Sequence, residues 1–365
     1  MGSKIVRRIV AESEIPQLFS VLTKDLPSSD LQSLLMEVYR ARATDLREPD
    51  VTDRTGRALL APSKIDARLL NEFDRIAFET AAGFEAIELS PVAPLGLTRV
   101  LGAIDQNNVL TTIRNAEVLG DATVALALEC SRRRRRDSTT IRLVSSHRVI
   151  RLQPFDVPGY VPHFRLLSMV SAGRDTGSHN FEIQHLGEHL RLYLRFFEAL
   201  NAHGFSLTTP LVEISDSQVT ESLLAAQGIG MEQLRESIRA HRAGGSEQFL
   251  SERGIELPSD VVDPSADLGH RAGFVKTKLL DKLQAEFPEA RFRFNFARLE
   301  GLSYYRGLTL RISPATADGV RYPIVDGGFT NWTARLLGNR KERMLTSGIG
   351  TEFVCFRYRR EKEKS

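Results

Sequence analysis

Cysteine is nearly absent from this sequence: Cys130 and Cys355 are the only two among 365 residues. They are far apart and in no spacing typical of a metal site, so we expect no disulfide framework, as is usual in a reducing cytoplasm. No apolar run approaches the length of a membrane span, and the N-terminus lacks the apolar core of a signal peptide. The sequence therefore predicts a cytoplasmic protein without a membrane partner.

Neither positive nor negative charge is in large excess, because the 49 Lys and Arg residues nearly balance the 46 Asp and Glu residues. The resulting net charge of +3 is too small to indicate nucleic acid by itself. Hydrophobic residues make up 42% and charged residues 26% of the chain, as in ordinary globular proteins. A chain of 365 residues is long enough for more than one structural unit.

The one run of like charge is the block of five arginines from Arg132 to Arg136. Such a block can bind RNA or another polyanion through phosphate contacts. No aromatic residues are interleaved with it, and short charged blocks are usually solvated. We therefore predict a solvated loop here.

The most informative segment is the C-terminal fifth of the chain. It contains "EGLSYYRG" at 300–307, "VDGGFTNWTARLLGN" at 325–339 and "TSGIGTEF" at 346–353. The pattern predicts a strand carrying Tyr304 and Tyr305, then a glycine pair that opens a helix, and finally a strand and turn built on Gly348 and Gly350.

This order and spacing resemble the end of the catalytic core of histidyl-tRNA synthetase, a class II aminoacyl-tRNA synthetase. The resemblance implies an α+β fold, with a six-stranded antiparallel sheet flanked by helices and a small helical insertion. The chain departs from the family pattern at three positions. The arginine and the aspartate that precede the tyrosine pair in the family are Glu300 and Ser303 here, and the arginine after the last glycine turn is Phe353.

The same resemblance suggests where the units of the chain begin and end. We expect an N-terminal helical segment (1–62), a first part of the core (63–210), a helical insertion (211–290), a second part of the core (291–354) and a charged tail (355–365). Because the chain ends just after the final glycine turn, we expect no anticodon-binding domain, which argues against tRNA as a partner.

Residues 63–91 predict a helix followed by a strand. Ser63 is a plausible cap, the apolar face continues to residue 82, Gly83 stops the helix, and an alternating strand ends at Pro91. Any amphipathic helix that leads into a strand gives this pattern. The resemblance equates it with class II motif 1, which implies a homodimer.

Asp121 and Thr123 match the family position that holds the α-amino group of the substrate, with Glu117 as a nearby alternative. A carboxylate and a hydroxyl suit an ammonium group, because the first supplies charge and the second a further acceptor. The structural alternative is that Asp121 caps a helix over 122–130.

Residues 139–173 alternate as two strands around a turn rich in proline and glycine. The resemblance to class II motif 2 assigns Arg151 the catalytic role of holding the α-phosphate and the carboxylate, with Arg148 as a shifted alternative. Gln153 stands where the family has an acid, and Phe164 lies on the second strand. All four residues are therefore candidates for a nucleotide site.

Leu166 and Val170 occupy the two strand positions at which the family recognises histidine with polar side chains. An imidazole buried against apolar groups would lose hydrogen bonds at about 1–3 kcal/mol. Histidine is therefore a poor candidate ligand. We expect a pocket between strands 141–153, 162–173 and 302–310, with Arg151 and the tyrosine pair inside it and an apolar floor.

The "HLGEH" segment at 185–189 matches a zinc-peptidase pattern in form. Gly187 interrupts it and no third ligand is evident. We therefore interpret His185 and His189 as two histidines on a surface helix and expect no metal site.

Two functions of different classes remain. One is a ligase that activates an amino acid or another carboxylate with ATP and Mg²⁺, using Arg151, the tyrosine pair, and Gly348 and Gly350. The other is a non-catalytic subunit similar to the regulatory subunit of ATP phosphoribosyltransferase, which would bind an amino-acid-like ligand and a partner biosynthetic enzyme. Phe353 favours the second, because it cannot supply the charge of the arginine that handles ATP. Arg340 and Arg343 are candidates to compensate from the preceding loop.

Overall fold

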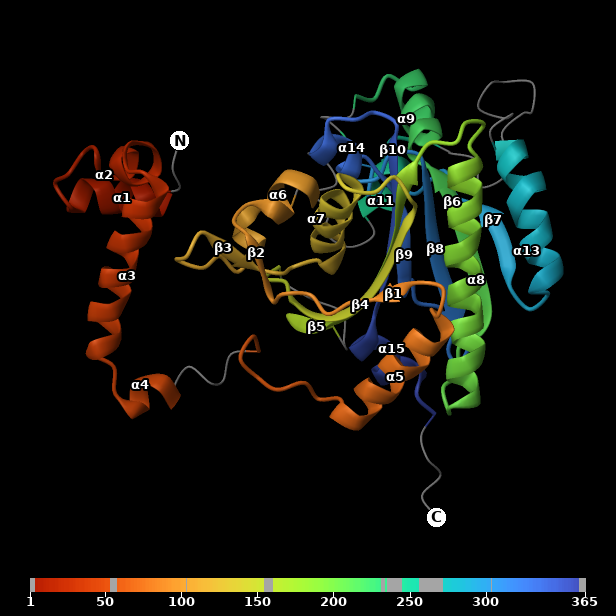
Figure 1. The fold of residues 1–365 in the computed structure, drawn as a ribbon, viewed down its shortest axis with the longest axis horizontal. Helices are drawn as coiled ribbons and strands as arrows, with labels where there is room; N and C mark the ends of the chain where they lie inside the picture. Colours follow the sequence, from red (N-terminus) through yellow and green to blue (C-terminus); the bar gives the residue numbers. More distant parts are fainter. Residues whose placement is uncertain are drawn as a thin grey trace, which may run out of the picture.

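The computed structural model describes residues 4–52, 58–102, 104–153, 160–230, 234, 245–255, 272–302 and 304–360. Its centre is an eight-stranded sheet with the strand order β1-β4-β5-β10-β9-β8-β6-β7 (Figure 1). These strands are β1 (Glu85–Ala86), β4 (Ile141–Ile150), β5 (His163–Arg174), β6 (Thr208–Asp216), β7 (Arg291–Phe294), β8 (Leu308–Ala315), β9 (Val325–Thr330) and β10 (Glu342–Gly350). A separate two-stranded sheet pairs β2 (Val92–Pro94) with β3 (Ala116–Val118).

The six inner strands of the large sheet pair antiparallel throughout. The two edge strands are parallel to their neighbours, β1 to β4 and β7 to β6. The expected α+β class and the antiparallel six-stranded core are confirmed. Of the two short edge strands, β1 lies within the strand predicted to end at Pro91 but has only two residues.

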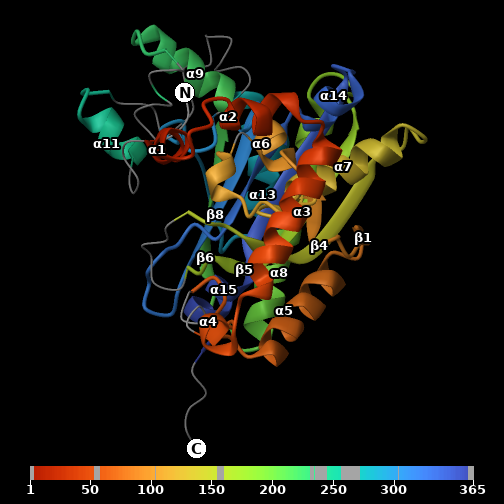
Figure 2. The same ribbon diagram turned by 90° about the vertical axis from the view of Figure 1, so that its left-hand side faces the viewer.

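Helices cover both faces of this sheet (Figures 1 and 2). Along β5, Leu167 and Met169 belong to the larger core with α8 (Asn180–Ala202), whereas Leu166 and Val170 belong to a second core with α7 (Ala122–Arg134). Successive side chains of a strand point to opposite faces, so one apolar strand serves both cores. The larger core also contains α5 (Ala67–Thr80) and α15 (Thr351–Tyr358), and the second contains α6 (Leu97–Gly102) and α14 (Trp332–Leu337). The remaining short element is η2 (Gln106–Asn108).

Several predicted boundaries differ from the structure. Helix α5 begins after Asp66, whose side chain accepts a hydrogen bond from the Arg68 backbone, and not at Ser63. Tyr304 and Tyr305 lie in the segment before β8, not on the strand. The glycine pair lies inside β9, and Gly348 and Gly350 lie inside β10.

The glycine pair in β9 is explained by close contacts across the sheet. A Cβ atom at Gly328 would lie 2.7 Å from the ring of Tyr305, and one at Gly327 would lie 2.6 Å from the Cβ atom of Ser347. Residues without a side chain are therefore needed for Tyr305 to pack on β9. The glycine pair is therefore required for close packing within the sheet and does not start a helix.

The N-terminal segment forms short helices, as predicted. They are α1 (Lys4–Glu12), α2 (Leu18–Ser20), η1 (Val21–Asp25), α3 (Ser28–Thr44) and α4 (Glu48–Thr52), and none of them has a buried residue. Figure 1 shows this N-terminal arm beside the body of the molecule. The side chain of Asn115 reaches it, with its Nδ2 atom 3.4 Å from the Ser28 carbonyl oxygen. No helix in the described ranges is long and apolar enough to cross a membrane.

The expected boundary of the insertion at residue 211 falls inside β6, so residues 211–216 belong to the central sheet. The described helices between β6 and β7 are α9 (Ser217–Ala226), α11 (Gly245–Ser251), η3 (Lys276–Leu280) and α13 (Asp281–Glu286). A small apolar cluster joins α9 and α11 to Leu299 and Leu302, just before the tyrosine pair. The insertion therefore supports one wall of the pocket described below.

The prediction of a solvated loop at the arginine block is wrong for Arg132 to Arg134, whereas Arg135 and Arg136 lie in the turn after α7 and are exposed. Arg132 to Arg134 form the last turn of α7, where cations interact favourably with the helix dipole. Arg133 pairs with Glu85 and Glu129, at 2.6 Å in each case. Arg134 forms a bidentate pair with Glu342 on β10, with both bonds 2.9 Å long. These arginines tie the helix to the sheet.

Candidate functional site

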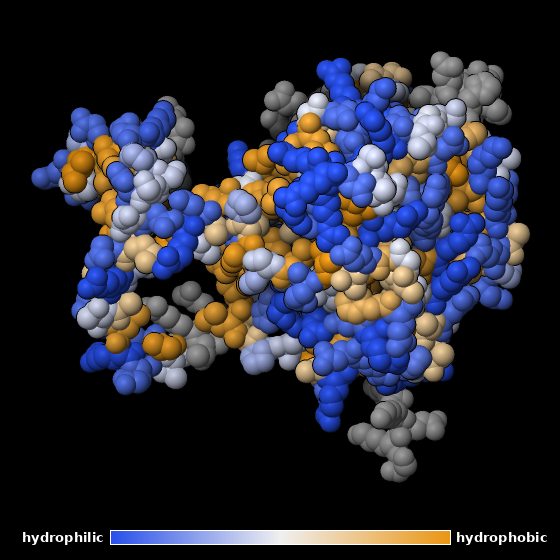
Figure 3. All heavy atoms as spheres, in the orientation of Figure 1, coloured by the Kyte–Doolittle hydropathy of each residue, from blue (hydrophilic) through white to orange (hydrophobic). Residues whose placement is uncertain are grey.

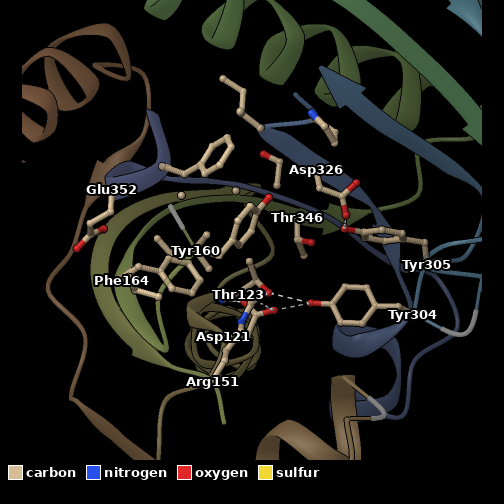
Figure 4. Close-up of a pocket in the computed structure, with 18 residues that line it drawn as sticks. Asp121, Thr123, Arg151, Tyr160, Phe164, Tyr304, Tyr305, Asp326, Thr346 and Glu352 are labelled. Atoms are coloured by element: carbon tan, nitrogen blue, oxygen red, sulfur yellow. Dashed lines mark hydrogen bonds and ion pairs between the residues drawn. The ribbon is translucent and has the colours of Figure 1, made fainter. Parts of the chain in front are cut away.

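A pocket of about 240 Å³ lies on the face of the sheet that carries α7 (Figure 4). It is bounded by the start of α7, the ends of β4 and β5, the strands β9 and β10, and the segment with the tyrosine pair. Its lining residues are Asp121, Thr123, Arg151, Tyr160, Val161, Phe164, Leu166, Tyr304, Tyr305, Pro323, Ile324, Asp326, Thr346, Ser347, Gly348, Gly350, Glu352 and Phe353. The structure thus brings together nine of the residues selected from the sequence: Asp121, Thr123, Arg151, Phe164, Leu166, Tyr304, Tyr305, Gly348 and Gly350.

Asp121 caps a helix and also lines the pocket. Its Oδ1 atom accepts hydrogen bonds from the backbone and the hydroxyl of Thr123, at 2.9 and 2.7 Å, so it caps α7. Its Oδ2 atom accepts a hydrogen bond from the Tyr304 hydroxyl at 3.0 Å, and the carboxylate side chain is 10% exposed. Capping therefore fixes the carboxylate at the edge of the pocket.

Tyr304 closes this polar cluster. Its hydroxyl oxygen lies 3.1 Å from Thr123 Oγ1, and its ring packs edge-on against Trp332. Burial, followed by the charge of Asp121, raises the pKa of Tyr304 well above its usual value. The phenol therefore stays protonated and acts as a hydrogen-bond donor.

Glu117, the alternative to Asp121, is fully buried elsewhere. Its carboxylate accepts hydrogen bonds from the backbone of Gly96 and of Thr98, each at 2.8 Å. Burial favours the neutral acid, but these bonds outweigh it and lower the pKa of Glu117. Glu117 thus orders the start of α6 and does not line the pocket.

Arg151 is fixed beside Asp121. Its Nε atom donates to the Gly120 carbonyl at 2.9 Å, and the guanidinium carbon lies 5.3 Å from the centre of the Phe164 ring. One terminal nitrogen is 3.8 Å from Asp121 Oδ2. The terminal nitrogens make no hydrogen bond with any residue in the described ranges, so they can bind an anionic group of a ligand.

Asp326 and Arg298 were not selected from the sequence. The Tyr305 hydroxyl donates to Asp326 Oδ2 at 3.1 Å, and the guanidinium of Arg298 donates to Oδ1. The sequence did offer a signal, because Asp326 directly precedes the glycine pair, and the strand places such a residue beside the tyrosine that packs on those glycines.

The other side of the pocket is apolar and aromatic. The ring of Phe353 on α15 lies 4.8 Å from that of Tyr160 and 5.4 Å from that of Tyr322. Phe164, Leu166 and Ile324 complete this side. The expected apolar floor is therefore present, with Phe353 as part of it.

Three selected residues lie away from the pocket lining. Val170 is fully buried in the core around α7. Arg148 pairs with Glu352 at 2.9 Å and contacts the ring of His163 at 3.0 Å. Gln153 lines a neighbouring cavity, which shares Asp121, Arg151, Tyr304, Tyr305 and Asp326 with the pocket.

The positions at which the family pattern was broken have specific surroundings. Glu300 lies within 3.4 Å of Arg311 and does not line the pocket, while Ser303 is outside the described residues. Arg343 is held by Asp175 at 2.6 Å and by Glu182 at 3.1 Å. Neither Arg343 nor Arg340 lines the pocket, so they do not compensate for Phe353.

His185 and His189 are buried, which contradicts the surface helix that we had predicted. His185 Nδ1 is 2.8 Å from Glu188, and His189 bridges the hydroxyls of Ser171 and Ser347, at 3.0 and 2.8 Å. Burial lowers the pKa of His189 to about 3, so it is neutral. No three His, Cys, Asp or Glu side chains within the described part of the chain are placed to hold a metal ion.

The fold was compared with known proteins. No protein-family model and no curated sequence matches the chain. Histidyl-tRNA synthetase from Nostoc sp. PCC 7120 superposes with a TM-score of 0.61 over 82% of this chain and 74% of that chain, at 17% identity. A histidine–tRNA ligase subunit from Alicyclobacillus acidocaldarius gives 0.59 over 81% and 95%, at 15% identity. An ATP phosphoribosyltransferase regulatory subunit/histidyl-tRNA synthetase from Bacillus halodurans gives 0.59 over 81% and 82%, at 16% identity.

These likenesses are of fold. They confirm the resemblance drawn from the C-terminal motifs: the chain has the class II core fold of histidyl-tRNA synthetase and of similar regulatory subunits. Identities of 15 to 17% carry no ligand or activity to this chain.

Proposed function

We propose that this protein binds an amino-acid-like ligand in the pocket. The ligand's ammonium group contacts Asp121, Thr123 and Tyr304, and its carboxylate contacts Arg151. The observation that carries the proposal is the cluster of three oxygen atoms at the start of α7, beside a guanidinium whose terminal nitrogens face the pocket. An ammonium group has three donors, and acceptors that include a carboxylate give the stronger, charge-assisted bonds.

Binding without activation of the ligand is the function that the lining favours. Among the described residues, Arg151 is the only arginine or lysine that lines the pocket. The rings of Phe353 and Tyr160 line its far side, with Tyr322 packed behind Phe353. ATP with Mg²⁺ carries several negative charges that need cations nearby. These residues do not fit that group, so we place the protein with non-catalytic, regulatory relatives of the fold. Such a role requires a partner enzyme that senses the bound ligand.

The second candidate is an ATP-dependent ligase for a carboxylate other than histidine. The specific observation in its favour is Arg151, which the ring of Phe164 and the Gly120 carbonyl hold in place beside the pocket. Gly348 and Gly350 also leave one wall of the pocket open. The exchange assay described in the Discussion separates the two candidates.

Replacing Asp121 by asparagine is expected to weaken amino-acid binding about 10–100-fold, because a hydrogen bond to a charged group contributes about 1.5–3 kcal/mol. Titration calorimetry with the individual proteinogenic amino acids measures this, and histidine is expected to be a weak ligand. Asparagine still caps a helix, so the fold should persist.

The matched control is Asp216→Asn, because Asp216 caps α9 through the backbone of Gln218 and does not line the pocket. It should leave the affinity unchanged. The proposal is wrong if no amino acid binds to the wild type, or if Asp121→Asn and Asp216→Asn behave alike.

We also propose that the protein is a homodimer that associates through the segment 63–91. A groove lies beside this segment. Ile87, Leu89, Val92 and Leu128 are among its apolar lining residues, its charged ones are Glu88, Glu129, Arg132, Arg133 and Arg135, and Val92 is 44% exposed. Figure 3 shows apolar side chains exposed on this side of the body, over β2 and α6. Exposed apolar patches of this kind are typical of association sites.

Light scattering of the purified protein is expected to give the mass of a dimer, and Leu89→Asp is expected to give a monomer. Val320→Asp, at an exposed position outside this segment, is the control and should remain dimeric. A monomeric wild type would contradict the proposal.

A further inference from the structure

Asp326 is the second carboxylate held by a tyrosine at this pocket. It lies on β9 and lines both the pocket and the neighbouring cavity. Figure 4 shows its carboxylate beside the hydroxyl of Tyr305, across the pocket from Phe164. Asp121 and Tyr304 form the first such pair, and the two tyrosine rings pack edge to face with centres 4.8 Å apart.

The two members of the ion pair between Arg298 and Asp326 differ greatly in exposure. The side chain of Arg298 is 3% exposed, whereas that of Asp326 is 54% exposed. Arg298 also donates to the Leu310 carbonyl at 3.1 Å, which fixes the guanidinium behind the strand. The arginine therefore holds the carboxylate from the buried side and leaves its other side open to the cavity.

The open side of Asp326 still has acceptor capacity. A carboxylate can accept about four hydrogen bonds, and Arg298 and Tyr305 account for one at each oxygen. Burial, followed by the charge of Asp326, raises the pKa of Tyr305 well above its usual value, so its hydroxyl remains a donor. No other residue in the described ranges donates a hydrogen bond to Asp326, so the remaining acceptor sites are open to a donor from the ligand or to water.

A ligand with a single ammonium group satisfies only one of the two carboxylates. The proposed function places that ammonium group at Asp121, next to Arg151. A side chain that extends from there past the tyrosine pair displaces water from Asp326. An apolar side chain leaves that carboxylate without a new partner, whereas a cationic one replaces the lost bonds with a charge-assisted pair.

Resting on the proposed function, we propose that Asp326 selects basic amino acids, whose side chain ends in a second ammonium or a guanidinium group. Asp121 and Thr123 hold the α-ammonium group, Arg151 the α-carboxylate, and Asp326 the terminal cation. Tyr305 and Arg298 act as positioning residues, because they fix the carboxylate that contacts the ligand. The apolar wall formed by Leu166 and Phe164 packs against the methylene groups between the two charged ends.

Titration calorimetry with lysine, ornithine and arginine, compared with norleucine, tests the inference. Norleucine resembles lysine without the terminal ammonium group. At least one basic amino acid is expected to bind the wild type about 10-fold or more tightly than norleucine, as one charge-assisted hydrogen bond implies. Asp326→Asn should remove this preference, because it weakens binding of the basic amino acids and does not weaken binding of norleucine. Asp121→Asn should weaken binding of both.

Two further variants protect this test against a folding artefact. Asp175→Asn removes an acid that is also paired with an arginine, Arg343, but lies outside the pocket, and it should leave all affinities unchanged. Tyr305→Phe keeps the ring on Gly328 and removes one bond to Asp326, so it should weaken binding of basic amino acids only.

The inference is overturned if norleucine binds as tightly as the basic amino acids, or if Asp326→Asn leaves the preference intact. In either case the proposed function still stands, provided that Asp121→Asn weakens binding. If no amino acid binds to the wild type, the proposed function fails first and the inference fails with it.

Discussion

Exchange of pyrophosphate into ATP in the presence of histidine is expected to be absent, or at least about 10²–10³-fold slower than with an active histidyl-tRNA synthetase core assayed in parallel. Losses of this size follow from one missing electrostatic contact to the reacting groups, and here several are missing. Phe353 packs among aromatic rings, Glu300 lies beside Arg311, and Gln153 lies in the neighbouring cavity. Leu166 also offers the imidazole no hydrogen bond.

The same assay, extended to the other proteinogenic amino acids and to ornithine, separates the two candidate functions. Exchange with any of them that disappears in Arg151→Ala would establish the ligase and reject the binding-only function. Arg165→Ala is the matched control, because Arg165 is on β5 and pairs with Asp74 away from the pocket. The proposed function requires that no amino acid in the set supports exchange, while calorimetry shows that an amino acid binds.

Local patterns predicted those parts of the fold in which burial and periodicity agree. The strands β4 and β5 alternate and pair in register from Ile141 to Ile150, and α8 has a continuous apolar face. Local patterns predicted a strand in the segment that contains β1 but not that it is only two residues long, and they did not predict the position of the glycine pair. β1 has two residues and is defined by its partner β4. Gly327 and Gly328 are required by contacts with residues far away in the chain, such as Ser347 and Tyr305. Contacts of this kind cannot be derived from a window of neighbouring residues.

In the candidate site, too, some selected residues lie together as expected, whereas others are kept away from the pocket by packing. Asp121 and Thr123 were selected from one motif and Tyr304 from another, and the three lie within hydrogen-bonding distance of one another. Val170 was selected with Leu166 because the two occupy the positions at which the family recognises histidine. Four residues of strand span about 13 Å, and α7 covers the end of the strand that carries Val170. Arg148 is on the opposite face from its neighbour Val149, which packs in the core around α7. A residue's position along its strand, the face to which its side chain points and the helix that covers that face thus decide whether it lines the pocket.

The buried ion pair between α7 and β10 is expected to have the largest effect on stability. Arg134 and Glu342 have side-chain exposures of 2% and 5% and are joined by two hydrogen bonds of 2.9 Å. Replacing Arg134 by methionine leaves the Glu342 carboxylate buried without its counter-ion. We expect the free energy of unfolding in denaturant to fall by about 3–5 kcal/mol, as is typical when one partner of a buried pair is removed.

Arg132→Met is the matched control from the same helical turn. Arg132 pairs with Glu129, but its side chain is 57% exposed, so its removal should change the free energy of unfolding by less than about 1 kcal/mol. The double variant Arg134→Met/Glu342→Met should recover most of the loss, because two apolar side chains of similar volume leave no buried charge unpaired. Small and equal losses for Arg132→Met and Arg134→Met would contradict a structural role for the pair. They would instead support a solvated arginine block, as the sequence alone predicts.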